Sequence, residues 1–107
     1  MSSDQPRRRW RFYRTAGGAT PVREFLTSPT LPSEDRVEVL AAMKDVQING
    51  LPVARHLRGE IYEVRATGAH ASYRVLFAAE GSRSQVLLAV SAFSKKTQKT
   101  PPREIAL

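Results

Sequence analysis

VLLAVSAF, residues 86–93, is the most apolar run of the chain, and the cationic stretch SKKTQKTPPRE, residues 94–104, follows it directly. A run that is apolar at both parities is expected of an interior strand covered on both faces. Such a strand would deliver the lysines that follow it to the surface as a short basic loop, and Pro101 would begin a new segment. A phosphate backbone is the first partner that this loop suggests.

Two further strands are predicted immediately before this run, at residues 61–67 and 72–79, where apolar and polar side chains alternate. The connections between the three strands are short, so they are expected to form an antiparallel meander. Arg65 and Arg74 would then project from the open face of the sheet, with the cationic loop at its rim. The apolar parity, expected to face the helices, comprises Tyr62, Val64, Tyr73, Val75 and Phe77.

The N-terminal half predicts one strand and two helices. Residues 9–15 alternate arginine with aromatic side chains, as in a strand at or near a sheet edge. Helical apolar spacing predicts helices over residues 21–28 and 33–48, with Ser33 as a cap for the second. Residues 51–59 are expected to be a connector containing at most a short extended piece. The apolar stripe of the second helix would consist of Val39, Leu40, Met43 and Val46.

These elements predict an α+β fold. It would have an antiparallel sheet of about four strands, two N-terminal helices packed on one face, and a short C-terminal helix after Pro101. We expect residues 1–8 to be a disordered basic leader and residues 9–107 to be a single domain.

Positive charge is concentrated at the two ends of the chain. The net charge is +7, of which residues 1–15 contribute +4 and residues 94–107 contribute +3, while the residues between them balance. Clustered positive charge favours a polyanion partner over a merely solubilising surface.

Several classes of function lack their motifs. The chain has no cysteine, no run of about 20 apolar residues, no phosphate-binding glycine motif and no nucleophile elbow. No spacing of histidines and carboxylates predicts a metal site, and no cofactor is expected. We therefore expect a soluble cytoplasmic protein without a membrane partner.

The open face would carry arginine, lysine, tyrosine and phenylalanine. This set suits metal-free cleavage of RNA by its own 2′-hydroxyl, because arginine forks bind phosphoryl oxygens and clustered cations lower the pKa of a lysine. Aromatic rings can hold an unstacked base. The composition does not separate catalysis from plain polyanion binding or a solvated surface.

Four segments resemble HigB-like, phage-related toxins of the RelE/ParE superfamily. The segments are PVREFL at 21–26, IYEVR at 61–65, YRVLF at 73–77, and FSKKTQKTP at 93–101 followed by REI at 103–105. The resemblance implies a small α+β domain with a concave antiparallel sheet, acting as the toxin of a type II toxin–antitoxin pair. It implies a ribosome-dependent mRNA interferase and an antitoxin with a helix-turn-helix domain, through which alone operator DNA would be bound.

The resemblance implies catalytic roles for Arg65, Arg74 and Lys96, with phosphate contacts from Lys95 and Lys99. The residues themselves add Phe93, as a ring for base stacking, and Arg58, as positive charge beside a groove.

Two departures from the family pattern affect proton transfer. Ser91 occupies a position where many relatives place a histidine, and no tyrosine follows Tyr73. Arg65 also has a structural interpretation, a pair with a carboxylate near Glu63.

Two alternatives stay open at this point. One is a ParE-like, non-enzymatic inhibitor of gyrase, and the other is a non-toxic nucleic-acid-binding module.

Overall fold

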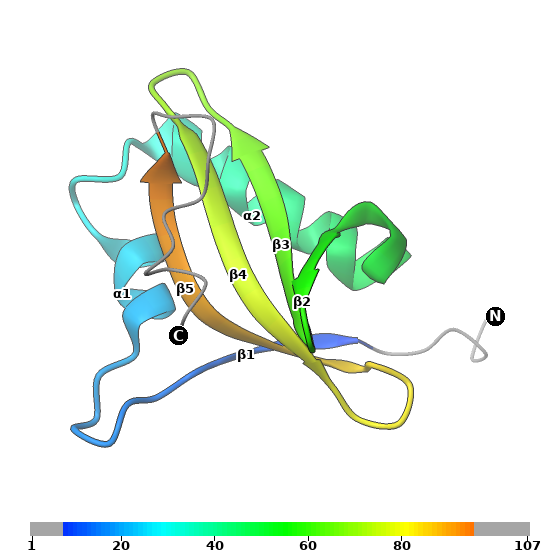
Figure 1. Ribbon diagram of the computed structural model, residues 1–107. Helices are drawn as coiled ribbons and strands as arrows, with labels where there is room; N and C mark the ends of the chain where they lie inside the picture. Colours follow the sequence, from blue (N-terminus) through cyan, green and yellow to red (C-terminus); the bar gives the residue numbers. More distant parts are fainter. Residues whose placement is uncertain (1–7, 96–107) are drawn as a thin grey trace, which may run out of the picture.

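The computed structural model describes residues 8–95 of the 107-residue chain (Figure 1). The fold is α+β, as predicted. The elements in chain order are β1 (Arg9–Phe12), α1 (Pro21–Thr27), α2 (Ser33–Asn49), the 3-10 helix η1 (Leu51–Val53), β2 (Arg55–Arg58), β3 (Ile61–Thr67), β4 (Ser72–Glu80) and β5 (Val86–Lys95). The predicted C-terminal helix lies outside the described residues, as does the predicted leader apart from Arg8.

The sheet has five strands in the order β1-β5-β4-β3-β2, and it is mixed. Strands β2 to β5 form the antiparallel meander, but β1 pairs with β5 in parallel. The expectation of about four antiparallel strands was therefore wrong on both counts. Two helices separate β1 from the meander, and a crossover of this length allows parallel pairing. The predicted edge position of β1 is confirmed.

The extra strand is β2, which occupies part of the segment expected to be a connector. It pairs antiparallel with β3, and the register shifts between His56 and Arg58. The residues Arg55–Arg58 carry no apolar alternation, so their pairing depends on the free edge that β3 offers.

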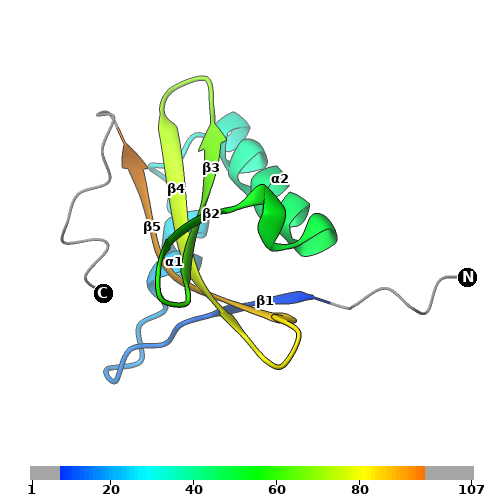
Figure 2. The same ribbon diagram turned by 45° about the vertical axis from the view of Figure 1, so that its right-hand side comes forward.

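Both helices lie on one face of the sheet and leave the other face open (Figures 1 and 2). This arrangement was predicted from the strand parity. Trp10 donates a hydrogen bond to the Met43 carbonyl at 2.8 Å and packs edge-on against Phe77, which is fully buried. The core between the layers contains Val22, Leu26, Val39, Met43, Val46, Val64, Val75, Phe77, Leu87 and Ala89.

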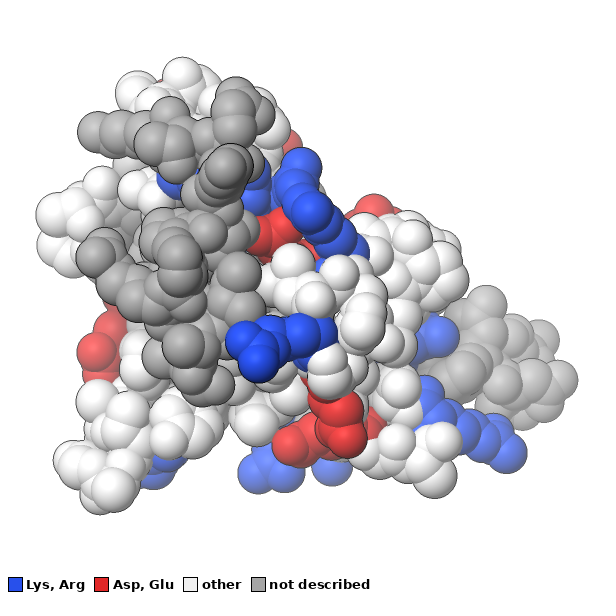
Figure 3. All heavy atoms as spheres, in the orientation of Figure 1, with Lys and Arg blue, Asp and Glu red and all other residues white. Residues whose placement is uncertain are grey.

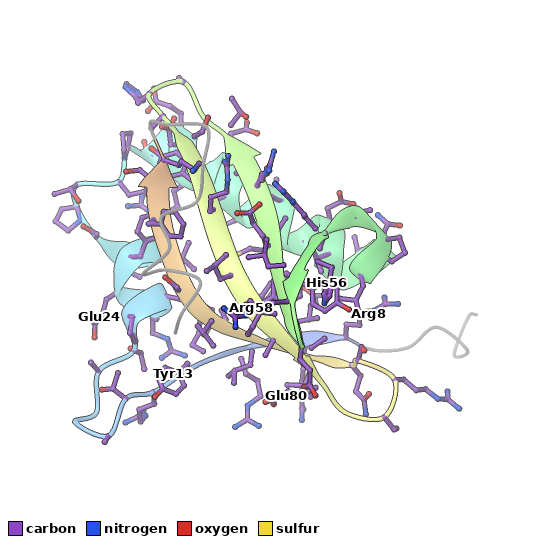
Figure 4. All side chains as sticks on the ribbon, viewed as in Figure 1. Arg8, Tyr13, Glu24, His56, Arg58 and Glu80 are labelled. Atoms are coloured by element: carbon purple, nitrogen blue, oxygen red, sulfur yellow. The ribbon has the colours of Figure 1, made fainter. Side chains whose placement is uncertain are left out.

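Helix α2 differs from its prediction in two respects. Leu40 is 46% exposed instead of lying in the apolar stripe, and Ser33 begins the helix without making a side-chain cap. The buried position one turn before Val39 is filled by Asp35. At the other end, the Arg8 guanidinium donates to the carbonyls of Gln47 and Ile48, where a cation suits the helix dipole (Figure 4).

Asp35 joins the start of α2 to the turn between β3 and β4. Its carboxylate accepts hydrogen bonds from the Tyr73 hydroxyl at 2.6 Å and from the backbone N–H groups of Ala69 and His70. Burial disfavours the charged carboxylate, but these hydrogen bonds outweigh it and lower the pKa of Asp35. Burial and the bond to Asp35 raise the pKa of Tyr73 to about 12. A side chain at Gly68 would collide with this carboxylate.

No helix in the region from residue 8 to residue 95 is long and apolar enough to cross a membrane.

Candidate functional site

The open face carries a compact group of charged side chains, Glu63, Arg65, Arg74 and Lys95, which we call the cation cluster. Arg65 stands directly opposite Arg74 in the β3–β4 register, and Arg74 in turn stands opposite Phe93 of β5. Because alternate residues of a strand share a face, Glu63 lies on the same face as Arg65. Figure 3 shows acidic and basic side chains together in the upper part of this face.

Glu63 is the buried centre of the cation cluster. Its Oε1 lies 3.0 Å from Arg65 Nε and its Oε2 lies 3.4 Å from Arg74 Nε. The Glu63 side chain is fully buried, whereas that of Arg65 is 49% exposed. Both contacts use the Nε edge of the guanidinium groups. One carboxylate therefore orients both guanidinium groups through their Nε edges, and the terminal nitrogens of Arg65 make no hydrogen bond within residues 8–95.

Arg74 is the more buried of the two arginines. Its Nη1 donates to the Tyr73 carbonyl at 3.4 Å, and its Nε has no hydrogen bond of good geometry within residues 8–95. Burial lowers the pKa of Arg74, the Glu63 carboxylate opposes this, and the charges of Arg65 and Arg55 add to the lowering. An arginine stays protonated in proteins even so, which makes Arg74 a permanent buried cation.

Lys95 is 5% exposed, and its Nζ is buried without a hydrogen-bond partner among the described residues. Burial and the neighbouring charge of Arg74 lower the pKa of Lys95, although Glu63 opposes them. A buried ammonium without a partner is costly. Lys95 therefore has two properties expected of a functional lysine. Its Nζ can still donate to an anionic hydrogen-bond partner, and its lowered pKa favours loss of the proton.

Phe93 and Ser91 continue the site along β5. Phe93 lies beside Arg74 on the open face and is partly exposed. Ser91, the position of the missing histidine, is buried opposite Leu76. His56 does not replace that histidine, because its ring packs on Tyr62 at 5.0 Å and its Nε2 lies 2.8 Å from the Gly59 carbonyl.

The remaining candidate residues lie elsewhere. Arg58 stands opposite Ile61, at the other end of β3 from Arg65, so it is not part of the cation cluster although it extends over the open face (Figure 4). Lys96 and Lys99 lie outside the described residues. No group of three or more potential metal ligands occurs within residues 8–95.

Two residues of the site were not singled out from the sequence. Glu63 entered the sequence analysis only as a neighbour of Arg65, and Arg55 was not proposed for the site. Arg55 pairs with Glu63 across β2 and β3 and influences the pKa of Arg74. The two residues stand opposite each other, and this position is visible only after the pairing of β2 with β3 is known.

Comparisons with known proteins identify the family of the chain. Residues 29–107 match the family described as "Phage derived protein Gp49-like". The chain is 32% identical over 100 residues to a protein named "Probable endoribonuclease HigB1" from Mycobacterium tuberculosis, in strains CDC 1551 / Oshkosh and ATCC 25618 / H37Rv. The match covers 90% of this chain and 75% of the relative.

The chain belongs to the Gp49-like family of HigB-like toxins. The resemblance inferred from the lysine motif and the strand segments is thereby confirmed. Membership of this family implies a cognate antitoxin. The cation cluster of this HigB-like protein lies on the strands that carry three of the segments quoted for the resemblance. These segments are IYEVR, YRVLF and the start of FSKKTQKTP.

Proposed function

We propose that this HigB-like protein is the toxin of a type II toxin–antitoxin pair and cleaves mRNA on the ribosome. The observation that carries the proposal is the buried Lys95 Nζ, which has no hydrogen-bond partner within residues 8–95 and lies near two arginines oriented by Glu63. This arrangement suits a phosphate with developing negative charge. The name of the M. tuberculosis relative supports an RNA substrate.

The reaction needs no group outside the RNA as nucleophile. The 2′-oxygen attacks phosphorus, the bond to the 5′-oxygen breaks, and the products are a 2′,3′-cyclic phosphate and a 5′-hydroxyl end. One proton leaves the 2′-hydroxyl and one reaches the departing 5′-oxygen. Metal ions are not required for these steps, and we propose that the enzyme works without one.

Each residue of the cluster has a proposed role. Arg65 and Arg74 hold the non-bridging phosphoryl oxygens, because their planar forks match this geometry. Lys95, whose neutral form is favoured by burial, accepts or returns a proton, and Lys96 adds charge or a second proton carrier. Lys99 adds a phosphate contact. Phe93 stacks on a base next to the scissile bond.

The proposed partners follow from the same chemistry. The cytoplasmic ribosome presents the mRNA, and an antitoxin with a helix-turn-helix domain covers or distorts the basic face and binds operator DNA. An acidic segment of the antitoxin is the complementary match for this face.

The test is induction of the wild-type chain beside Arg74→Ala and Lys95→Ala, with growth recorded and the 5′ ends of mRNA mapped. New ends should appear with the wild type and fall roughly a hundredfold with Arg74→Ala, as for other preorganised charge stabilisers. Arg83→Ala, an exposed arginine in the β4–β5 turn, is the matched control and should cleave like the wild type. Growth arrest without new mRNA ends but with loss of DNA supercoiling would instead identify a gyrase inhibitor.

Lys95→Arg separates charge from proton transfer. Arginine keeps the positive charge but does not give up its proton. If Lys95 only neutralises phosphate, Lys95→Arg should retain most cleavage. If it transfers a proton, both Lys95→Arg and Lys95→Ala should lose cleavage.

A further inference from the structure

A second basic surface lies around the edge strand β1, away from the cation cluster. It consists of Arg11, Tyr13, Arg14 and Arg23, which we call the edge patch. These side chains line an open depression of about 590 Å³ beside Leu88. Figure 4 places Tyr13 below α1, at the start of the segment that joins β1 to α1.

The edge patch differs from the cation cluster in lacking acidic partners within residues 8–95. Arg65 and Arg74 contact Glu63, whereas no ion pair involves Arg11, Arg14 or Arg23 within residues 8–95. No carboxylate lines the depression. All three arginines are exposed, so their positive charge is available to a ligand.

Two aromatic rings accompany these charges. The Arg23 guanidinium lies 5.4 Å from the centre of the Phe12 ring, which holds this arginine beside the depression. Tyr13 is 44% exposed, although its neighbours Trp10 and Phe12 pack against the core. Free cations around an exposed ring are the combination that proteins use to bind single-stranded nucleic acid, in which phosphates meet arginines and a base stacks on the ring.

The strand register connects the edge patch to the rest of the open face. One row crosses all five strands, through Arg58, Ile61, Ala78, Leu88 and Arg11. Arginines therefore end the row on both sides. Figure 3 shows further basic side chains along the lower margin of the molecule, apart from the upper cluster.

The distance between the two sites suits one continuous strand. Five residues of β5 separate Phe93 from Leu88, or about 17 Å at ~3.3 Å per residue. A stacked strand carries one phosphate per ~3.4 Å, so about five nucleotides would span this distance. Glu60 and Glu80 line a separate depression at the end of β4 and would repel a strand there, which directs the path towards β1.

We infer that the edge patch is an RNA-binding site that takes phosphates on Arg11, Arg14 and Arg23 and one unstacked base on Tyr13. The inference rests on the proposed function, because it assumes that the partner of the open face is RNA. The RNA is either the substrate strand beyond the cleaved bond or ribosomal RNA beside it. In both cases the patch binds and does not take part in the chemical step.

The first experiment measures binding of the full chain to a fluorescent ten-nucleotide RNA, methylated at every 2′-oxygen to prevent cleavage. Arg11→Ala combined with Arg14→Ala is compared with Lys44→Ala combined with Arg83→Ala, which removes the same charge from exposed positions elsewhere. Loss of two phosphate contacts should lower the slope of log affinity against log salt by about 1.4. The control pair should leave the slope unchanged.

Tyr13 gives an independent test with a conservative variant. Tyr13→Ala should weaken binding about fivefold or more, the lower end of the usual loss for one stacked base, while Tyr13→Phe should bind like the wild type. A ring that serves only the fold would leave binding unchanged in both variants. Thermal unfolding checks that the variants are folded.

The second experiment identifies the source of the RNA. The same variants are sedimented with ribosomes that carry no mRNA. A loss confined to the oligonucleotide indicates the substrate strand, and a loss confined to the ribosomes indicates ribosomal RNA; both outcomes support the patch. Equal losses in patch and control variants, or wild-type binding in both assays with reduced affinity only for the antitoxin, overturn it.

Failure of the proposed function remains distinguishable. If Arg74→Ala still yields new mRNA ends, the cation cluster is not the cleavage site, but the salt slope still decides whether the edge patch binds RNA. If the salt slope of the Arg11→Ala, Arg14→Ala variant equals that of the wild type while Arg74→Ala abolishes cleavage, the cation cluster is the cleavage site and the edge patch does not bind RNA.

Discussion

Two carboxylates are fully buried within residues 8–95, and they are held in opposite ways. Asp35, on the helix side, is bound by a hydroxyl and two backbone N–H groups, all of them neutral donors. Glu63, on the open side, is bound by two arginines. Neutral donors satisfy a carboxylate completely and bind elements together, whereas paired cations leave excess positive charge. The first arrangement fits a role in stability, and the second fits a role in ligand binding.

The largest effect should follow a change at the open-side carboxylate. Glu63→Gln keeps the shape of the side chain but offers only one oxygen, so it cannot orient both arginines. Cleavage of a reporter mRNA in a translation extract should fall by up to about a hundredfold. Glu80→Gln, an exposed glutamate on the same sheet, should cleave normally. Equal activity of Glu63→Gln and the wild type would show that the arginines need no orientation.

A smaller effect, on stability, is expected at the helix-side carboxylate. Tyr73→Phe removes one hydrogen bond to a charged acceptor and should lower the free energy of unfolding by about 2 kcal/mol, measured with urea. Asp35→Ala should cost more, because three donors lose their acceptor. Tyr13→Phe is the control, since the Tyr13 hydroxyl has no hydrogen bond within residues 8–95. A normal cleavage rate per folded molecule in Tyr73→Phe would show that Asp35 serves stability alone. A large loss of cleavage would show that Asp35 also contributes to the site around Glu63.

The smallest effects concern pH and test the same Asp35–Tyr73 bond from both sides. The pKa of Asp35 is lowered by folding, so its contribution to stability is present above the unfolded pKa of about 4 and lost as pH falls through the folded value. The pKa of Tyr73 is raised to about 12, so its contribution is present below about 10 and lost as pH rises towards 12. Urea unfolding of Tyr73→Phe should therefore lack the alkaline loss that the wild type shows between these values.

The sequence predicted the parts of the fold that depend on local patterns. Alternation placed Tyr62, Val64 and Val75 towards the helices and Arg65 and Arg74 on the open face, because a period of two assigns faces without knowledge of partners. Pairing is a tertiary property. It follows that the pairing of β2 with β3, in a segment expected to contain only a short extended piece, and the parallel alignment of β1 with β5 were not predicted.

The residue types of the candidate site could be predicted from the sequence, but their burial and contacts could not. The arginines and lysines were identified by type and by resemblance, but their catalytic roles remain predictions. The burial of Glu63 and of Lys95 could not be read from the sequence, because each depends on neighbours contributed by other strands. Leu40 shows the same limit in a helix, since an apolar residue with suitable spacing is exposed where nothing packs over it.

The pairing of β1 with β5 has a consequence for synthesis of the protein. Arg9, near the start of the chain, finds its partner only when Val86 has emerged from the ribosome. Pairing between such distant segments is slow to form, and the cations of the cluster come from β3, β4 and the last residue of β5. A nascent chain therefore has no assembled cation cluster until the ribosome has translated the codons of β5 and Lys95 has left the exit tunnel.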